Sequence, residues 1–199
     1  TTRLTMSIRP HSSVPMLTTP HRKGTPMELI SKRLTLRPWL DSDAPALYNL
    51  ARSPKVGPAA GWTVHENVGQ SLDILRNILR GPEQYAITLR DTGELIGAIG
   101  LKTREDCPYL SSDNAYSVGY WIGEEHWGHG YAPEALERLV EHARDDLKAH
   151  TIWADHFICN EKSHRVMEKC GLLPVRTDIS DAVGPDGSRE ILIMRRDLR

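Results

Sequence analysis

The segment Trp127-Gly128-His129-Gly130-Tyr131-Ala132 connects a predicted buried strand to a predicted helix. Its two glycines let the backbone approach a ligand without interference from Cβ atoms. The helix that follows contributes unpaired N–H groups and the positive end of its dipole. Together these features predict an anion site suited to phosphate or pyrophosphate. A tight strand-to-helix turn, with glycines required by geometry alone, is the simpler alternative.

Two common phosphate motifs do not fit this segment. It lacks the GK[ST] ending of a P-loop, and it lacks GxGxxG spacing with an acidic residue at the end of the next strand. The sequence therefore argues against a nucleotide hydrolase and against a dinucleotide enzyme.

Strand-like and helix-like patterns alternate on both sides of the turn. Period-two or apolar runs predict strands, and 3.6-residue periodicity with caps predicts helices. The predicted strands cover 34–37, 85–89, 95–101, 115–122, 151–159, 172–177 and 190–195, and the predicted helices cover 43–51, 67–80, 133–146 and 160–170. The prolines and glycines between 54 and 61 predict a loop. This order predicts an α/β (α+β) fold with one mixed, mostly antiparallel sheet of about six or seven strands and helices on both faces.

A length of 199 residues favours a single domain, which we place at 28–199. Residues 1–27 hold four prolines, four basic residues and no acidic residue, and we expect a disordered or extended leader there. The rest of the chain keeps 21 basic against 26 acidic residues, a net charge of −5. That balance argues against a nucleic-acid binder. No apolar run approaches the roughly 18 residues of a membrane span.

The cysteines and histidines predict neither disulfides nor a metal site. Cys107, Cys159 and Cys170 lack CxxC spacing, which favours a reducing compartment and a cytoplasmic location. His126 and His129 have HxxH spacing, but no third ligand lies nearby in the sequence.

Four motifs follow one another along the chain: Leu34-Thr35-Leu36-Arg37-Pro38, Gly97-Ala98-Ile99-Gly100, Val118-Gly119-Tyr120-Trp121-Ile122 running into the glycine turn, and Asn160-Glu161-Lys162-Ser163 through Gly171-Leu172. In this order they make the sequence resemble the GNAT superfamily of acyl-CoA-dependent N-acyltransferases. The resemblance covers 29–197 and is closest to the branch that acetylates the N-termini of ribosomal proteins.

The resemblance implies acetyl-CoA as co-substrate, with no metal. It implies that backbone amides of Gly128, His129, Gly130, Tyr131 and Ala132 hold the pyrophosphate. Trp127 stands where the superfamily usually has Gln or Arg, a departure common in this branch that leaves the backbone cradle intact. The coenzyme arm would lie along the preceding strand, with Trp121 and Ile122 as main-chain partners.

The resemblance also implies roles for the next helix and the last strand. Asn160 would contact the coenzyme arm, although helix capping alone explains this residue. Many superfamily members have a tyrosine acid where this chain has Met167, which makes Ser163 the candidate to stabilise the departing sulfur, with simple helix capping as the alternative. Glu190 resembles the acid of this branch and is the first candidate for the general base, although it can equally be a strand-end carboxylate that faces water; Asp155 and His156 are weaker candidates.

Trp62 and His65 lie where this family lines its acceptor pocket, although such a tryptophan often belongs to the core.

The function predicted is transfer of an acetyl group to a primary amine, either a protein N-terminus or a small molecule. Succinyl-CoA or another acyl-CoA as donor, a non-catalytic coenzyme A sensor, and an unrelated phosphate-binding protein are alternatives. We expect a small-molecule or peptide amine as partner, no nucleic acid or membrane, and a monomer or homodimer.

Overall fold

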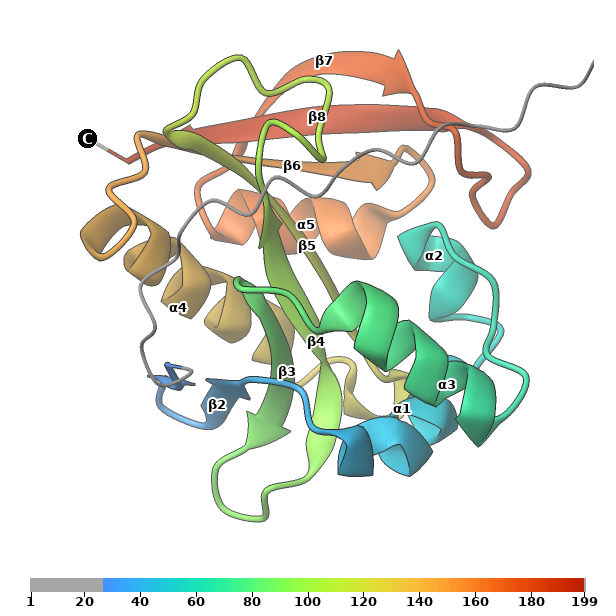
Figure 1. The fold of residues 1–199 in the computed structure, drawn as a ribbon. Helices are drawn as coiled ribbons and strands as arrows, with labels where there is room; N and C mark the ends of the chain where they lie inside the picture. The colour runs from blue at the N-terminus through green and yellow to red at the C-terminus, as the bar shows by residue number, and fades with distance from the viewer. Residues whose placement is uncertain (1–26, 199) are drawn as a thin grey trace, which may run out of the picture.

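The computed structural model describes residues 27–198, so the predicted leader lies outside the described residues except for Met27. One eight-stranded sheet runs through the described chain in the order β1-β2-β3-β4-β5-β6-β8-β7 (Figure 1). All neighbouring strands are antiparallel except β5 and β6, which are parallel. The predicted mixed α/β fold is confirmed.

The sheet has one more strand than the largest number predicted. Its strands are β1 (Leu29–Ile30), β2 (Leu34–Arg37), β3 (Gln84–Leu89), β4 (Leu95–Lys102), β5 (Ala115–Ile122), β6 (Thr151–Phe157), β7 (Leu173–Ile179) and β8 (Glu190–Asp197). The additional strand is β1, whose two residues are too few to show an alternating pattern.

The helices follow the prediction in three places and depart from it in two. They are α1 (Ala44–Ala51), α2 (Gly57–Ala60), α3 (Val68–Ile74), α4 (Tyr131–Asp145) and α5 (Glu161–Lys169), with short helical turns at Asp41–Asp43, Leu75–Leu79 and Glu124–His126. The segment predicted as a loop around residue 57 contains α2, which Gly61 ends with a left-handed φ of 85°. The helix predicted over 67–80 is α-helical only as far as Ile74, and a π-helical turn completes it.

Two apolar layers hold helices against opposite faces of the sheet (Figure 1). On one face, the buried side of α4, including Leu136 and Leu139, packs with Met167 of α5 against strand residues such as Ile99. On the other face, α1 and the end of α3 pack against Ala86 and Ala98, among others. The apolar stripe of α4 therefore fixes the helix whose N-terminus carries the glycine turn.

Candidate active site

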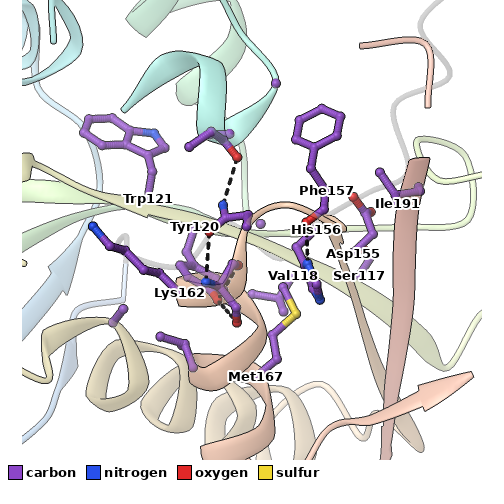
Figure 2. Close-up of a pocket in the computed structure, with 18 of the residues that line it drawn as sticks. Ser117, Val118, Tyr120, Trp121, Asp155, His156, Phe157, Lys162, Met167 and Ile191 are labelled. Carbon is purple, nitrogen blue, oxygen red and sulfur yellow. Dashed lines mark hydrogen bonds between the residues drawn. The ribbon is translucent and has the colours of Figure 1, made fainter. Parts of the chain in front are cut away.

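The parallel strands β5 and β6 separate before either one ends. Their pairing joins residues 115–117 to residues 151–153, whereas β5 continues to Ile122 and β6 to Phe157. The second half of β5 therefore has an open backbone edge. A cavity of about 1260 Å³ lies between the diverging strands, and Figure 2 shows side chains that line it.

The register of β4 and β5 decides which backbone groups face this cavity. The Gly123 N–H donates to the Ile96 carbonyl at 2.8 Å, and groups alternate in direction along an antiparallel ladder. Trp121 therefore directs its N–H and C=O at β4, whereas Tyr120 and Ile122 direct theirs at the open edge. The register gives the edge position to Tyr120 and Ile122 rather than to the predicted Trp121, whose side chain lines the cavity instead.

The glycine turn has the backbone geometry that an anion cradle requires. Gly128 and Gly130 are left-handed, with φ of 79° and 76°. A Cβ at Gly128 would meet no described atom within 4 Å, so the space beside it is open. The Glu134 N–H donates to the Gly130 carbonyl at 3.4 Å. The N–H groups that precede it at the start of α4 have no intrahelical acceptor and remain available to a ligand.

Arg33, in the loop between β1 and β2, holds the glycine turn like a clamp through several hydrogen bonds. Its Nη1 donates to the His129 carbonyl at 2.9 Å, and its backbone N–H and Nε donate to the two carboxylate oxygens of Glu134 at 2.7 Å each. The guanidinium also lies 4.6 Å from the centre of the Tyr131 ring. Burial alone would raise the pKa of Glu134, but hydrogen bonds from Arg33 and Ser31 outweigh it and lower that pKa. The clamp orients the turn, and the charge of its guanidinium is balanced by the Glu134 carboxylate.

Trp127 and Lys162 form the wall between the turn and α5. The Trp127 indole donates to the Ile122 carbonyl at 2.8 Å, which fixes the end of β5. The Lys162 ammonium lies 3.9 Å from the centre of the Trp127 ring. Because the cation is held at the cavity wall by a cation–π contact, it is positioned to attract an anionic ligand.

The first turn of α5 brings together Asn160, Ser163 and Tyr120. The Asn160 side chain accepts from the Ser163 N–H at 3.1 Å and donates to the Ala59 carbonyl at 3.1 Å, so it caps α5 and joins it to α2. The Ser163 hydroxyl lies 2.9 Å from the Tyr120 hydroxyl. All three side chains line the cavity, together with the apolar Met167.

The opposite end of the cavity carries polar groups on and near β6. The Tyr109 hydroxyl donates to Asp155 at 2.7 Å and lies 2.6 Å from the Ser117 hydroxyl. Burial, reinforced by the charge of Asp155, raises the pKa of Tyr109, so the phenol stays protonated and can donate. The exposed Asp155 carboxylate is thereby fixed at the cavity wall.

His156 lies beside Asp155 on β6 and is buried. Its Nδ1 is 2.7 Å from the Phe157 carbonyl, an acceptor, so Nδ1 carries the proton and Nε2 accepts from His164 at 3.0 Å. Burial lowers the pKa of His156 and keeps the ring neutral. Both ring nitrogens are therefore already paired within the protein.

A family model for the acetyltransferase (GNAT) domain matches residues 33–173, well over half of the chain. The chain belongs to the GNAT acetyltransferase family. YoaA of Bacillus subtilis (strain 168), an uncharacterized N-acetyltransferase, is 29% identical over 148 residues, which cover 72% of this chain and 81% of YoaA. This GNAT protein is an acyl-CoA-dependent N-acyltransferase.

Solved GNAT structures share the fold. An acetyltransferase of the family from Bacillus anthracis has a TM-score of 0.72 at 18% identity, over 86% of this chain and 98% of that one. RimJ of Mycobacterium smegmatis, solved in complex with CoA-disulfide, has a TM-score of 0.67 at 19% identity, over 83% of this chain and 82% of RimJ.

Four of the predicted site residues of this GNAT protein lie outside the cavity wall: Glu190, Trp62, His65 and His129, whose carbonyl accepts from Arg33 and whose ring stacks on Tyr131. Glu190 is exposed at the start of β8, and its neighbour Ile191 lines the cavity in its place. Trp62 packs edge-on against Trp121, with ring centres 5.6 Å apart, and is half-buried behind the cavity. His65 is buried, with Nδ1 2.8 Å from the Ser71 hydroxyl. The structure therefore places Trp62 and His65 in the packing that supports Trp121.

The described residues were also compared with the geometry that a metal site or a membrane-spanning helix requires. Within residues 27–198, no group of three or more His, Cys, Asp or Glu side chains is arranged to hold a metal ion. The His129 ring stacks on Tyr131 with centres 5.5 Å apart, and His126 pairs with Glu94 at 3.5 Å. No helix in that part of the chain is long and apolar enough to span a bilayer.

Proposed function

We propose that this protein transfers an acetyl group from acetyl-CoA to a primary amine by direct attack within a ternary complex. The observation that carries the proposal is a single cavity that runs from the glycine turn, past the open edge of β5, to Ser163 and on to Asp155. One end of that cavity suits an anionic donor, and the other end suits a cationic acceptor. A ternary complex requires both substrates in one site, which this cavity provides.

The donor would bind along the first half of the cavity. The amides of the turn and the N-terminus of α4 would hold the pyrophosphate, with Lys162 supplying positive charge and Arg33 fixing the turn. The open N–H and C=O groups of Tyr120 would hold the amide-bearing arm as an added strand does. Ser163 would then lie at the sulfur and donate a hydrogen bond to the thiolate that leaves.

Charge divides the cavity into two ends. The donor end is the part of the cavity that α5 and the glycine turn line. The acceptor end is the part that the following segments line: the end of β4, the β4–β5 loop, β6, and β7 with the β7–β8 loop. The charged residues are Lys162, Arg165 and Lys169 at the donor end, and Asp106, Asp155, Asp178 and Asp181 with Lys102 and Arg176 at the acceptor end. The excess of carboxylates favours a cationic amine, from a peptide N-terminus or a small molecule, as the acceptor.

Asp155 is the best-placed group to take the proton of the amine. It faces the cavity and is oriented by Tyr109, whereas His156 has no free nitrogen and Glu190 lies outside the cavity wall. Asp155→Asn would keep the size of the side chain and remove its basicity. We expect this variant to lower kcat about 100-fold, as loss of a general base does.

Calorimetry with acetyl-CoA, followed by a thiol-release assay over a panel of amines, tests the proposed function. Wild-type protein should bind acetyl-CoA and release thiol with at least one cationic primary amine. Gly128→Glu should abolish binding, because it places a carboxylate in the open space beside the turn. Gly93→Glu is the matched control: Gly93 has a φ of 74° and equally open surroundings, but lies in the β3–β4 turn away from the cavity.

Two alternatives are outcomes of the same assay. Faster thiol release with succinyl-CoA than with acetyl-CoA would assign the other donor. Tight binding without turnover on any amine would make the protein a coenzyme A sensor, an alternative motivated by Met167 at the usual position of the acid. Absence of acetyl-CoA binding, or equal loss in both glycine variants, would contradict the proposal.

A further inference from the structure

The phenol of Tyr120 meets the hydroxyl of Ser163 inside the cavity. Tyr120 lies on β5 and Ser163 on the first turn of α5, 43 residues later, and their hydroxyl oxygens are 2.9 Å apart. The same phenol lies 3.3 Å from the Ser163 carbonyl. Met167, one helical turn further along α5, brings no polar hydrogen to this place. Tyr120 is thus a hydroxyl partner of Ser163 supplied by a strand.

Only one of two hydrogen-bond arrangements makes Ser163 useful to a leaving thiolate. If Tyr120 donates to the Ser163 carbonyl, the serine proton points at the phenol oxygen and away from the cavity. If Tyr120 donates to the Ser163 Oγ, the serine proton is free to point into the cavity. The 2.9 Å contact between the hydroxyls exists in both arrangements, but for the phenol as donor the Ser163 Oγ is the nearer acceptor, at 2.9 Å against 3.3 Å for the carbonyl, which favours the second arrangement. Burial raises the pKa of Tyr120, so the phenol keeps its proton and stays a donor.

We propose that Tyr120 is a positioning residue that donates to the Ser163 Oγ and thereby aims the serine O–H at the sulfur of the acyl donor. The inference rests on the proposed function, which places that sulfur at Ser163. Tyr120 itself does not touch the donor sulfur in this arrangement. Its effect reaches the reaction through the serine hydroxyl.

The acyl transfer then balances without ionising either hydroxyl. The amine nitrogen forms a bond to the thioester carbonyl carbon, and the C–S bond breaks with its electron pair on sulfur. The cationic acceptor loses one proton to solvent before the attack, the nitrogen gives up a second proton to Asp155 as the amide forms, and the sulfur later takes one from solvent. Ser163 donates a hydrogen bond to the negative sulfur, and the bond from Tyr120 strengthens that donation by polarising the serine O–H.

Titration of bound coenzyme A tests this inference without turnover. The thiolate has its own ultraviolet absorbance, so the thiol pKa can be followed in the complex. Wild-type protein should lower that pKa below the value for free coenzyme A. Tyr120→Phe and Ser163→Ala should each move it back by about one pH unit, as expected for a lost or weakened hydrogen bond to a charged group. Tyr116→Phe, on the same strand and four residues earlier, is the matched control and should leave it unchanged.

Kinetics provides the second readout. Tyr120→Phe should lower kcat about tenfold with the KM for acetyl-CoA within about twofold, and the double variant with Ser163→Ala should lose no more than Ser163→Ala alone. A bound thiol pKa that is the same in Tyr120→Phe and wild type would overturn the inference and leave the proposed function standing. Multiplicative losses in the double variant would also overturn it, because the two residues would then act independently. Failure of wild-type protein to bind coenzyme A would refute both.

Discussion

Arg33 makes three hydrogen bonds to Glu134 and His129, which lie about half the chain away in the sequence. Arg33→Gln would remove the Nη1 bond to the His129 carbonyl and the charge-assisted Nε bond to Glu134. We expect the Kd for acetyl-CoA to rise about tenfold, because a charge-assisted bond is lost and the amides lose their fixed direction. Arg90→Gln is the control, because Arg90 bonds the Ser31 and Lys32 carbonyls of the same loop without touching the turn. Equal loss of affinity in both variants, measured by calorimetry, would show that loop stability and not the clamp sets binding.

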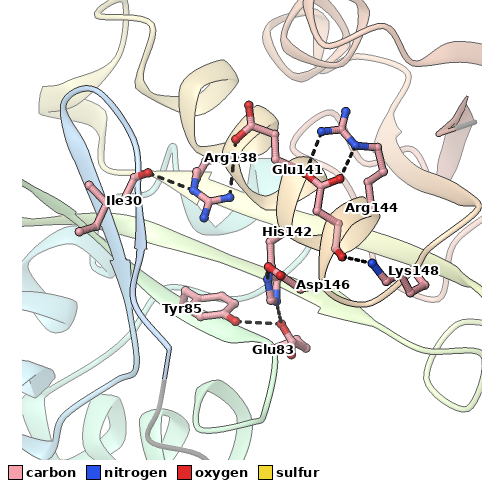
Figure 3. A network of polar contacts seen from close by, with 10 residues as sticks. Ile30, Glu83, Tyr85, Arg138, Glu141, His142, Arg144, Asp146 and Lys148 are labelled. Carbon is pink, nitrogen blue, oxygen red and sulfur yellow. Dashed lines mark hydrogen bonds and ion pairs between the residues drawn. The ribbon is translucent and has the colours of Figure 1, made fainter.

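His142 links protonation to stability at the C-terminal end of α4. Its side chain is 1% exposed and lies 3.0 Å from Glu83 and 2.7 Å from Asp146, and Tyr85 donates to the same Glu83 oxygen at 2.8 Å (Figure 3). Burial opposes protonation of the ring, but the bonds and charges of the two carboxylates outweigh it and raise the pKa of His142. A raised native pKa stabilises the fold fully below the unfolded pKa of about 6.5, and this contribution is lost as pH rises through the native pKa.

His142→Gln should therefore cost more free energy of unfolding at low pH than at high pH. Urea unfolding of both proteins from about pH 6 to about pH 9 measures the difference, which should shrink steadily as pH rises. Glu83→Gln in the wild-type background should flatten the dependence, because it removes one of the two carboxylates that face the ring. Parallel stability curves for wild type and His142→Gln would show that the imidazolium adds nothing.

At the scale of elements, β4 and β5 approach more closely than a side chain on Gly97 would permit. A Cβ there would lie 2.3 Å from the Trp121 carbonyl oxygen, a backbone atom that cannot move away alone. Gly97→Ala should destabilise the protein by about 1–3 kcal/mol, the usual cost of forced overpacking. Gly119→Ala on β5 is the control, because its Cβ would meet no described atom within 4 Å. If Gly97→Ala and wild type unfold at the same urea concentration, the two strands can move apart at no cost in stability.

Elements with a strong period were predictable from the sequence, and short or irregular ones were not. α4 repeats apolar residues every three to four positions, and β5 is rich in Tyr, Val, Trp and Ile, so both follow from the sequence. α2 has four residues in a segment of proline and glycine, which has the composition of a loop. β1 is held by its pairing with β2, a contact that no local pattern encodes.

At the scale of the whole molecule, the parts of the site that lie within one segment were predictable, and the parts that join distant segments were not. The glycine turn and its helix are one continuous segment, so their geometry follows from local sequence. Arg33 reaches Glu134 across 101 residues, Tyr109 reaches Asp155 across 46, and Tyr120 reaches Ser163 across 43. The first pair exists because α4 packs against β1 and β2, and the other two because the sheet order places β5 beside β6 and the two strands then diverge. No signal in the sequence alone reveals where that divergence begins.

The charge of residues 28–199, a net −5, and the carboxylates of the acceptor end predict attraction of cationic acceptors. At saturating acetyl-CoA, the KM for an amine with a second positive charge should rise several-fold between about 10 mM and about 100 mM salt, as the screening length falls from about 30 Å to about 10 Å. kcat should stay constant, because screening weakens encounter and binding but leaves the bound geometry unchanged. A primary amine of the same length with a neutral tail is the control and should show a much weaker salt dependence. If both amines respond equally, or neither responds, the acidic residues do not steer the acceptor, and its selection depends on the shape of the cavity alone.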